Sequence, residues 1–276
     1  MTRVLAAAST FVALLAFADA SPQPERPQRI VSLNLCTDQI LLQLVPHERI
    51  AALSFLSQDT RSSALSPLAR GMHTVRGNAE EVLALQPDLV LVGTYTTRHT
   101  NAMLRRFGIP VVAIPGANSF EEVRAEMRAV AKAVGEQARG EELIRQFDAR
   151  LDQLRASALP NDEVIMQYRS GGYTAGSNTL YDSIYEAAGL INGAKRAGVK
   201  GYGVLPMERL IEQRPGIINA SDYKPDTPTQ GNRMLTHPAI AALGAQSIVL
   251  ASRDTVCGGI WNLDAAALVR TQSQAP

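Results

Sequence analysis

Short apolar runs alternate with helical patterns along the first part of the chain. The runs are rich in Val, Ile and Leu, which predicts buried strands, and apolar positions between them recur at roughly the 3.6-residue period of a helix. We expect strands at residues 29–33, 50–54, 88–93 and 109–116, and helices at 38–44, 78–85 and 99–108. Strands that alternate with helices over short connections are typical of an open parallel α/β sheet.

The alternation stops at residue 118, and no strand pattern is found before residue 158. Apolar residues recur there at helical spacing in two sets, Val123, Met127, Val130 and Val134 before Gly135, and Ile144, Phe147, Leu151 and Leu154 after it. With at most one break, a helix of this length extends roughly 50–60 Å. Because that is more than one small sheet needs for cover, we expect a helical backbone that joins two lobes.

After Pro160 the alternation resumes. We expect strands at residues 163–168, 216–220 and 246–252, and helices at 178–189, 207–213, 237–243 and 263–272. The fold class is therefore α/β, with two lobes whose central, mostly parallel sheets are joined by a long interdomain helix. We expect an N-terminal lobe at 21–117, the helical backbone at 118–158 and a C-terminal lobe at 159–276.

One helix–turn–strand corner is present twice. "NAEEVLALQPDLVLVG" at 78–93 has a weaker copy in "MERLIEQRPGIINA" at 207–220. In the first copy Glu80 lies seven residues before Pro87, and in the second Glu208 lies seven residues before Pro215. Each Glu is in the first turn of its expected helix, where the helix dipole favours a negative charge.

The first twenty residues have the pattern of a secretory signal peptide. Arg3 precedes an apolar run from Val4 to Ala18, and small residues at Ala18 and Ala20 predict cleavage after Ala20. The alternative, a membrane anchor, needs about 20 apolar residues, more than this run supplies. The junction has no Cys of the kind a bacterial lipoprotein requires. We therefore expect an exported, periplasmic protein.

Charge and composition limit the kinds of molecule that this protein is expected to bind. The formal net charge is +1 and no basic block is present, so nothing indicates nucleic acid or an anionic membrane surface as a partner. The four His show no metal-ligand spacing, so neither a metal site nor a cofactor is expected. Cys36 and Cys257 leave three alternatives open: a disulfide, which an oxidising compartment permits, ligation of a metal or haem, or two free thiols.

The segment "GNAEEVLALQPDLVL", with the second corner, the helical backbone and the signal peptide, resembles the periplasmic substrate-binding proteins of ABC importers for iron complexes and cobalamin. The resemblance covers nearly the whole mature chain, from "RIVSLNLCTDQILLQL" onwards. It implies a monomer that captures a ferric siderophore or a corrinoid such as vitamin B12 between its lobes. The ligand would then be delivered to an ABC permease dimer with its cytoplasmic ATPase.

In that family an exposed Glu on each lobe docks into basic pockets on the two permease subunits. By position, the resemblance assigns this role to Glu80 and Glu208. Glu81 is adjacent and could share or take the role of Glu80. The alternative is that these Glu side chains only interact with the helix dipole, worth about 0.3–1 kcal/mol each.

Ligands of open α/β sheets bind beyond the carboxyl ends of the strands. The loops expected there are rich in aromatic and cationic residues. Tyr and Trp offer broad, flat contact with a polar tip, and Arg pairs with carboxylates or stacks on aromatic faces. The residues we expect to contact the ligand are Tyr95, Arg98, Arg169, Tyr173, Tyr202 and Trp261.

A bilobal α/β enzyme, either chelatase-like or a metallocluster-type oxidoreductase, is the alternative class. It would need acid–base pairs or metal ligands between the lobes. The sequence contains neither a Gly-x-Ser-x-Gly elbow nor a His-Glu-x-x-His motif, and no Cys has a His placed to activate it. We therefore expect a binding protein and not an enzyme, although fold alone does not decide function.

Overall fold

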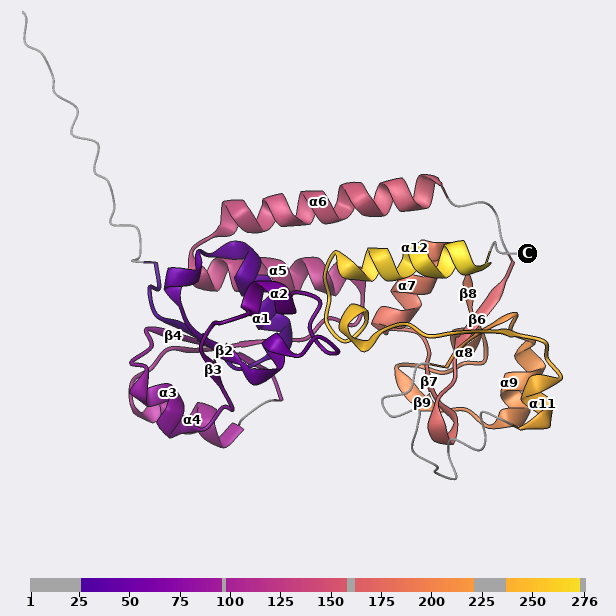
Figure 1. Ribbon diagram of the computed structural model, residues 1–276, viewed down its shortest axis with the longest axis horizontal. Coiled ribbons are helices and arrows are strands. Elements are labelled where there is room, and N and C mark those ends of the chain that lie inside the picture. Colours follow the sequence, from indigo (N-terminus) through magenta and orange to yellow (C-terminus); the bar gives the residue numbers. More distant parts are fainter. Residues whose placement is uncertain (1–25, 96–97, 158–161, 221–236, 274–276) are drawn as a thin grey trace, which may run out of the picture.

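The computed structural model describes residues 26–95, 98–157, 162–220 and 237–273. The expected signal peptide lies outside these residues. The chain forms two α/β lobes side by side, with long helices across one side of both (Figure 1). Within the described residues, no helix is long and apolar enough to cross a membrane.

The N-terminal lobe is built on a five-stranded parallel sheet in the order β3-β2-β1-β4-β5. Its strands are β1 (Ile30–Ser32), β2 (Ile50–Ser54), β3 (Thr74–Val75), β4 (Leu89–Gly93) and β5 (Val111–Ile114). The helices of this lobe are α1 (Leu35–Leu44), α2 (Ser66–Ala69), α3 (Ala79–Ala84) and α4 (Arg98–Arg106), with short 3-10 helices η1 (His47–Arg49) and η2 (Phe55–Gln58).

The C-terminal lobe has a four-stranded parallel sheet in the order β11-β10-β6-β8. Its strands are β6 (Val164–Gln167), β8 (Ile191–Asn192), β10 (Ile217–Asn219) and β11 (Gln246–Ile248). Its helices within the described residues are α7 (Leu180–Ala188), α8 (Gly193–Arg196), α9 (Met207–Gln213), α11 (Pro238–Ala241) and α12 (Trp261–Ser273), with η3 (Ser170–Gly172) and η4 (Ser252–Asp254). The antiparallel pair β7 (Tyr173–Ala175) and β9 (Tyr202–Val204) replaces two segments expected to be loops.

The helical backbone has the one break expected from the sequence, but the chain reverses there, so the two helices pack side by side and do not extend to the expected length of roughly 50–60 Å. Helix α5 (Phe120–Val134) ends at Gly135, whose φ of 75° lies in the left-handed region that glycine tolerates best. The chain then reverses into α6 (Gln137–Ala156), and the pair Arg128–Glu141 (2.8 Å) joins the two helices. Helix α6 alone, about 30 Å long, runs from one lobe to the other (Figure 1).

One hydrophobic core runs through both lobes. It includes Ile30 of β1, Phe147 of α6 and Ile165 of β6, all buried. The buried Arg270 of α12 donates hydrogen bonds to the carbonyl oxygens of Leu154 and of two residues at the end of α7. Helices α5, α6, α7 and α12 therefore form a shared layer that holds the lobes together.

The repeated corner folds the same way in both lobes. Gln86 (φ 48°) and Arg214 (φ 45°) each adopt a left-handed backbone directly before the buried Pro87 or Pro215. Each corner then leads into a strand, β4 or β10, that pairs with the first strand of its own sheet. The two copies hold their first-turn Glu residues in equivalent places, one on each lobe.

Candidate functional site

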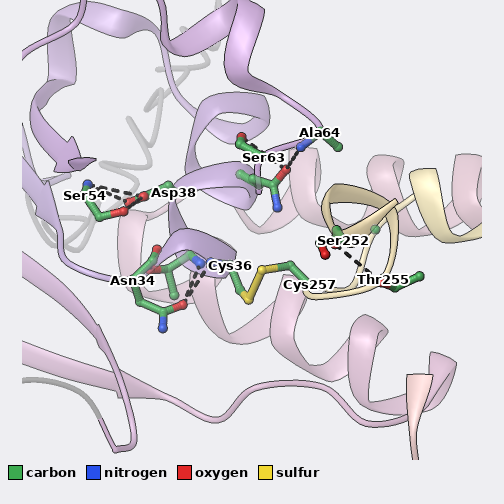
Figure 2. Close-up of a disulfide and its surroundings, with 12 residues drawn as sticks. Asn34, Cys36, Asp38, Ser54, Ser63, Ala64, Ser252, Thr255 and Cys257 are labelled. Carbon is green, nitrogen blue, oxygen red and sulfur yellow. Dashed lines mark hydrogen bonds between the residues drawn. A yellow bond between two sulfur atoms is a disulfide. The ribbon is translucent and has the colours of Figure 1, made fainter. Parts of the chain in front are cut away.

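A disulfide brings the carboxyl edge of the first sheet against the C-terminal segment. Cys36 is in the first turn of α1, directly after β1, and Cys257 lies in the loop before α12. Their sulfur atoms are bonded and their Cα atoms are 5.1 Å apart (Figure 2). Of the three alternatives left by the sequence, the structure has the disulfide. It joins residues that are 221 positions apart and come from different lobes.

Local hydrogen bonds fix the first Cys in place. The side chain of Asn34 caps α1 by accepting from the backbone N–H of Cys36 at 2.9 Å. One turn further, the buried carboxylate of Asp38 accepts from the backbone N–H and the hydroxyl of Ser54 at the end of β2 (Figure 2). Burial raises the pKa of Asp38 to about 7, because its charged form loses water. These contacts tie α1 to the carboxyl edge of the sheet.

Trp261 does not have the position expected of a ligand contact, and this corrects the sequence-based assignment. Its side chain is only 4% exposed and packs with Leu35 and Cys257. The indole Nε1 donates to the carbonyl oxygen of Cys257 at 2.8 Å. A Cβ on Gly259 would lie 2.3 Å from the ring, so the neighbouring glycine serves the packing of this Trp. Trp261 therefore packs between the two lobes, beside the disulfide.

The structure brings three of the expected residues together on the C-terminal lobe. Tyr173 and Tyr202 come from the paired strands β7 and β9, and their rings are stacked at 6.0 Å with an interplanar angle of 6°. Tyr202 is 47% exposed. The backbone N–H of Arg169 donates to the carbonyl oxygen of Tyr173 at 2.9 Å. We call these residues, Arg169, Tyr173 and Tyr202, the tyrosine shelf.

The phenol of Tyr202 stays protonated at neutral pH. Partial burial, with the neighbouring Tyr181 and Tyr173, raises its pKa to about 12, and the nearby Arg169 charge opposes this effect without cancelling it. The shelf therefore presents the neutral hydroxyl of Tyr202 and two aromatic rings, with the cation of Arg169 beside them.

On the N-terminal lobe, Tyr95 follows β4 and is 83% exposed, and Arg98 begins α4 and is also exposed. A second aromatic group, which is not among the ligand contacts expected from the sequence, lies directly after β2 and β3. The guanidinium of Arg76 is 5.3 Å from the ring centre of the half-exposed Phe55. Both residues directly follow strands, so the carboxyl-end rule could have identified them.

The two glutamates of the repeated corner are exposed in the first turns of α3 and α9. Figure 1 draws both helices on the edge of the molecule opposite α6. Glu81 differs from Glu80, because its carboxylate accepts from the backbone N–H of Arg76 at 2.9 Å and it is half-buried. Asn78, the residue before α3, makes no capping hydrogen bond with its side chain.

The part of the chain that the structure describes has no cluster of side chains suited to bind a metal ion. No group of three or more His, Cys, Asp or Glu side chains there is arranged to hold a metal ion. The surface that remains chemically distinctive is aromatic and cationic, at the carboxyl ends of the strands of both lobes.

Comparison with known families finds one match over most of the chain. Residues 30–246 match the sequence profile of a family whose description is "periplasmic binding protein". A cobalamin-binding protein of Halobacterium salinarum is 26% identical over 197 residues, which is 70% of this chain and 53% of the relative. An ABC transporter substrate-binding lipoprotein of Bacillus subtilis is 23% identical over 74% of this chain and 68% of its own length. The chain thus spans about half the length of the cobalamin-binding relative.

Among solved structures, the periplasmic haem-binding protein HutB of Vibrio cholerae superimposes with a TM-score of 0.74 at 21% identity. The match covers 90% of this chain and 99% of that one. A likeness at this identity shows a shared fold, and the matched relatives named above are binding proteins.

Proposed function

This chain belongs to the periplasmic binding protein family, and from that premise we propose that it captures an iron complex, such as a ferric siderophore, or a corrinoid such as vitamin B12 between its lobes. The observation that carries the proposal is the tyrosine shelf at the carboxyl edge of the C-terminal sheet. Relatives that bind cobalamin and haem support the same range of ligands. The protein would act in the periplasm as a carrier and not as an enzyme.

The shelf has the chemistry for such ligands. Two stacked, exposed rings offer a broad apolar surface whose polar tips accept and donate hydrogen bonds. Arg169 beside them suits a carboxylate or another anionic group of the ligand, since guanidinium pairs with carboxylates in two-point geometry. Tyr95 and Arg98, with Phe55 and Arg76, offer the same combination of aromatic ring and cation on the other lobe.

We also propose that Glu80 and Glu208 dock the protein onto a membrane permease built of two like subunits, which works with a cytoplasmic ATPase. Equivalent corners hold the two Glu residues on α3 and α9, so that two similar basic pockets could receive them. Because Glu81 is engaged with the backbone of Arg76, Glu80 is the carboxylate left to face a partner. Exposed charges of this kind mainly set association rate and register.

The test is a thermal-shift screen of the mature protein with haemin, cobalamin, cobinamide and ferric siderophores. A ligand that binds the folded state alone raises the melting temperature. We expect one of these compounds to do so and the double variant Tyr173→Ala, Tyr202→Ala to lose most of the shift. The control is Phe107→Ala, which removes an exposed aromatic side chain directly after the end of α4. If no compound stabilises the wild type, or if the double variant keeps the full shift, the proposal is wrong.

A further inference from the structure

Helix α4 carries a local positive charge that the near-neutral whole chain conceals. Between Asp88 and Glu121 the sequence has no acidic residue. Within this stretch α4 has Arg98 in its first turn and Arg105 and Arg106 in its last. Net charge averaged over 276 residues gives no sign of such a segment.

The packing of α4 turns these charges outwards. Asn101 and Leu104 are buried against the sheet, and the hydroxyl of Thr100 donates to the carbonyl oxygen of Gly77 at 2.8 Å, which holds α4 beside α3. At about 100° per residue, Arg106 is then at the centre of the outer face. Arg98 and Arg105 lie on one side of it.

The other side of this face is apolar. Met103 is 43% exposed and Phe107 is 65% exposed, and the two are four residues apart on neighbouring turns. Single exposed apolar side chains are common on soluble proteins, but a contiguous apolar edge beside three arginines is less so. We call Arg98, Met103, Arg105, Arg106 and Phe107 the α4 patch.

The charges of the α4 patch are not neutralised within the described part of the chain. None of its three arginines forms an ion pair there, and the one side-chain hydrogen bond of Arg105 goes to the carbonyl oxygen of Val111 at 3.3 Å. The first turn of α3, which packs beside α4, has two acidic residues: Glu81 is engaged with the backbone of Arg76, and Glu80 is exposed but pairs with none of the three arginines. The patch is therefore cationic, apolar at one edge and open to a partner.

We propose that the α4 patch binds the anionic phospholipid headgroups of a membrane surface. Guanidinium groups beside an outward-pointing Phe are the combination that associates with such interfaces, where phosphates pair with the cations and the ring enters the headgroup region. Helix α4 lies next to α3 on the edge of the N-terminal lobe opposite α6 (Figure 1). This proposal rests on the proposed function in one respect, the orientation of the protein. If Glu80 on α3 faces the permease, then α4 beside it faces the membrane in which the permease is embedded.

The test measures co-sedimentation of the mature protein with vesicles of equal parts phosphatidylglycerol and phosphatidylcholine, against vesicles of phosphatidylcholine alone. We expect binding to the anionic vesicles only, weakened by salt. The variant Arg105→Glu, Arg106→Glu should lower the partition coefficient by at least about tenfold. Phe107→Ser should lower it less. The control, Arg145→Glu with Arg155→Glu on α6, changes the net charge equally and should bind as the wild type does.

Three outcomes would overturn the proposal. They are equal binding to neutral vesicles, equal loss in the α4 and α6 variants, and no binding to anionic vesicles at low salt. In the last case, crosslinking of α4 to permease protein would assign the patch to an acidic protein surface. In that same case, binding of inorganic phosphate itself, lost in the Arg105→Glu, Arg106→Glu variant at matched ionic strength, would assign the patch to a free anion instead. The α4 charge variant should keep the thermal shift with the small-molecule ligand, so failure here is distinguishable from failure of the proposed function.

Discussion

The indole N–H of Trp261 donates to the carbonyl oxygen of Cys257 at 2.8 Å, and both residues are buried against Leu35 of the other lobe. A residue of the last helix is thereby fixed to the start of the first helix. The same few residues carry the disulfide, so a covalent and a packed contact hold the lobes at one place. This point joins the lobes on the side of the strands' carboxyl ends.

Truncation of this Trp should cost stability and spare ligand binding. We expect Trp261→Ala to lower the free energy of unfolding in urea by about 3–5 kcal/mol, the usual cost of removing a large buried aromatic side chain. Trp261→Phe should cost less because it keeps most of the apolar contact. Ligand affinity, measured by titration of the folded variant, should stay near that of the wild type. A large loss of ligand affinity with unchanged stability would mean that Trp261 contacts the ligand after all.

Loss of the disulfide should destabilise the protein through the unfolded chain. Closing a loop between Cys36 and Cys257 restricts the unfolded state, and at this separation the simple entropy model gives on the order of 5 kcal/mol. We expect Cys36→Ser with Cys257→Ser to lower the free energy of unfolding by up to this amount. The wild type treated with reductant should match the double variant, and reductant should leave the variant unchanged. Equal stability of oxidised and reduced wild type would contradict the prediction.

The repeated corner could be predicted from the sequence because its determinants are local. A helix ending before Xaa-Pro and an apolar run are contained within 78–93 and again within 207–220. The left-handed Gln86 and Arg214 then follow from the need to turn sharply before a buried proline. Most strands and helices of both lobes could be predicted from local patterns of the same kind.

The tyrosine shelf was only half predictable. Its residues were selected as loop aromatics, yet the strands β7 and β9 that stack them were not expected, since glycines weaken the strand pattern in both segments. The structure explains one of these glycines by close approach. A Cβ on Gly176 would lie 2.0 Å from the carbonyl oxygen of Val199. Pairing between segments distant in sequence leaves no local signal.

Trp261 was misassigned for a related reason. An aromatic residue after two glycines has the pattern of a ligand loop, but here Gly258 and Gly259 make room for Val123 and for the Trp ring itself. Burial of that ring depends on Leu35 and Cys36 of α1, which come from the other end of the chain. Sequence alone gives no measure of such a contact.

The docking proposal makes a prediction that separates two adjacent carboxylates. We expect Glu80→Ala with Glu208→Ala to slow uptake of the ligand by cells while affinity in solution is unchanged. Glu81→Ala should have a different effect, because removing its bond to Arg76 loosens the start of α3 and lowers the melting temperature modestly. Uptake assays with the cognate permease, next to thermal melts, check both statements. Normal uptake in the double variant would reject the docking role.

A buried carboxyl on α5 predicts how stability changes with pH. Glu126 is 3% exposed, and its Oε2 has no hydrogen-bond partner within the described residues. Burial raises its pKa from 4.5 to about 8, against the smaller effect of the backbone N–H of Ala117. The folded protein therefore holds a proton that the unfolded chain releases above about pH 4.5. The stability that this proton confers is complete below that pH and is lost as the pH rises to about 8.

Replacement of this carboxyl by its neutral isostere should remove that part of the pH dependence. We expect Glu126→Gln and the wild type to unfold with similar free energies near pH 4.5, and the variant to become more stable by a few kcal/mol near pH 8. Urea unfolding at a series of pH values measures the difference. Asp38, with a pKa of about 7, also loses a proton as the pH rises. Because Asp38 is present in both proteins, its contribution to the pH dependence of stability cancels when the two are compared. A difference between the two proteins that does not grow with pH would mean that Glu126 is already ionised in the folded state, and that water or a cation compensates its charge beside α5.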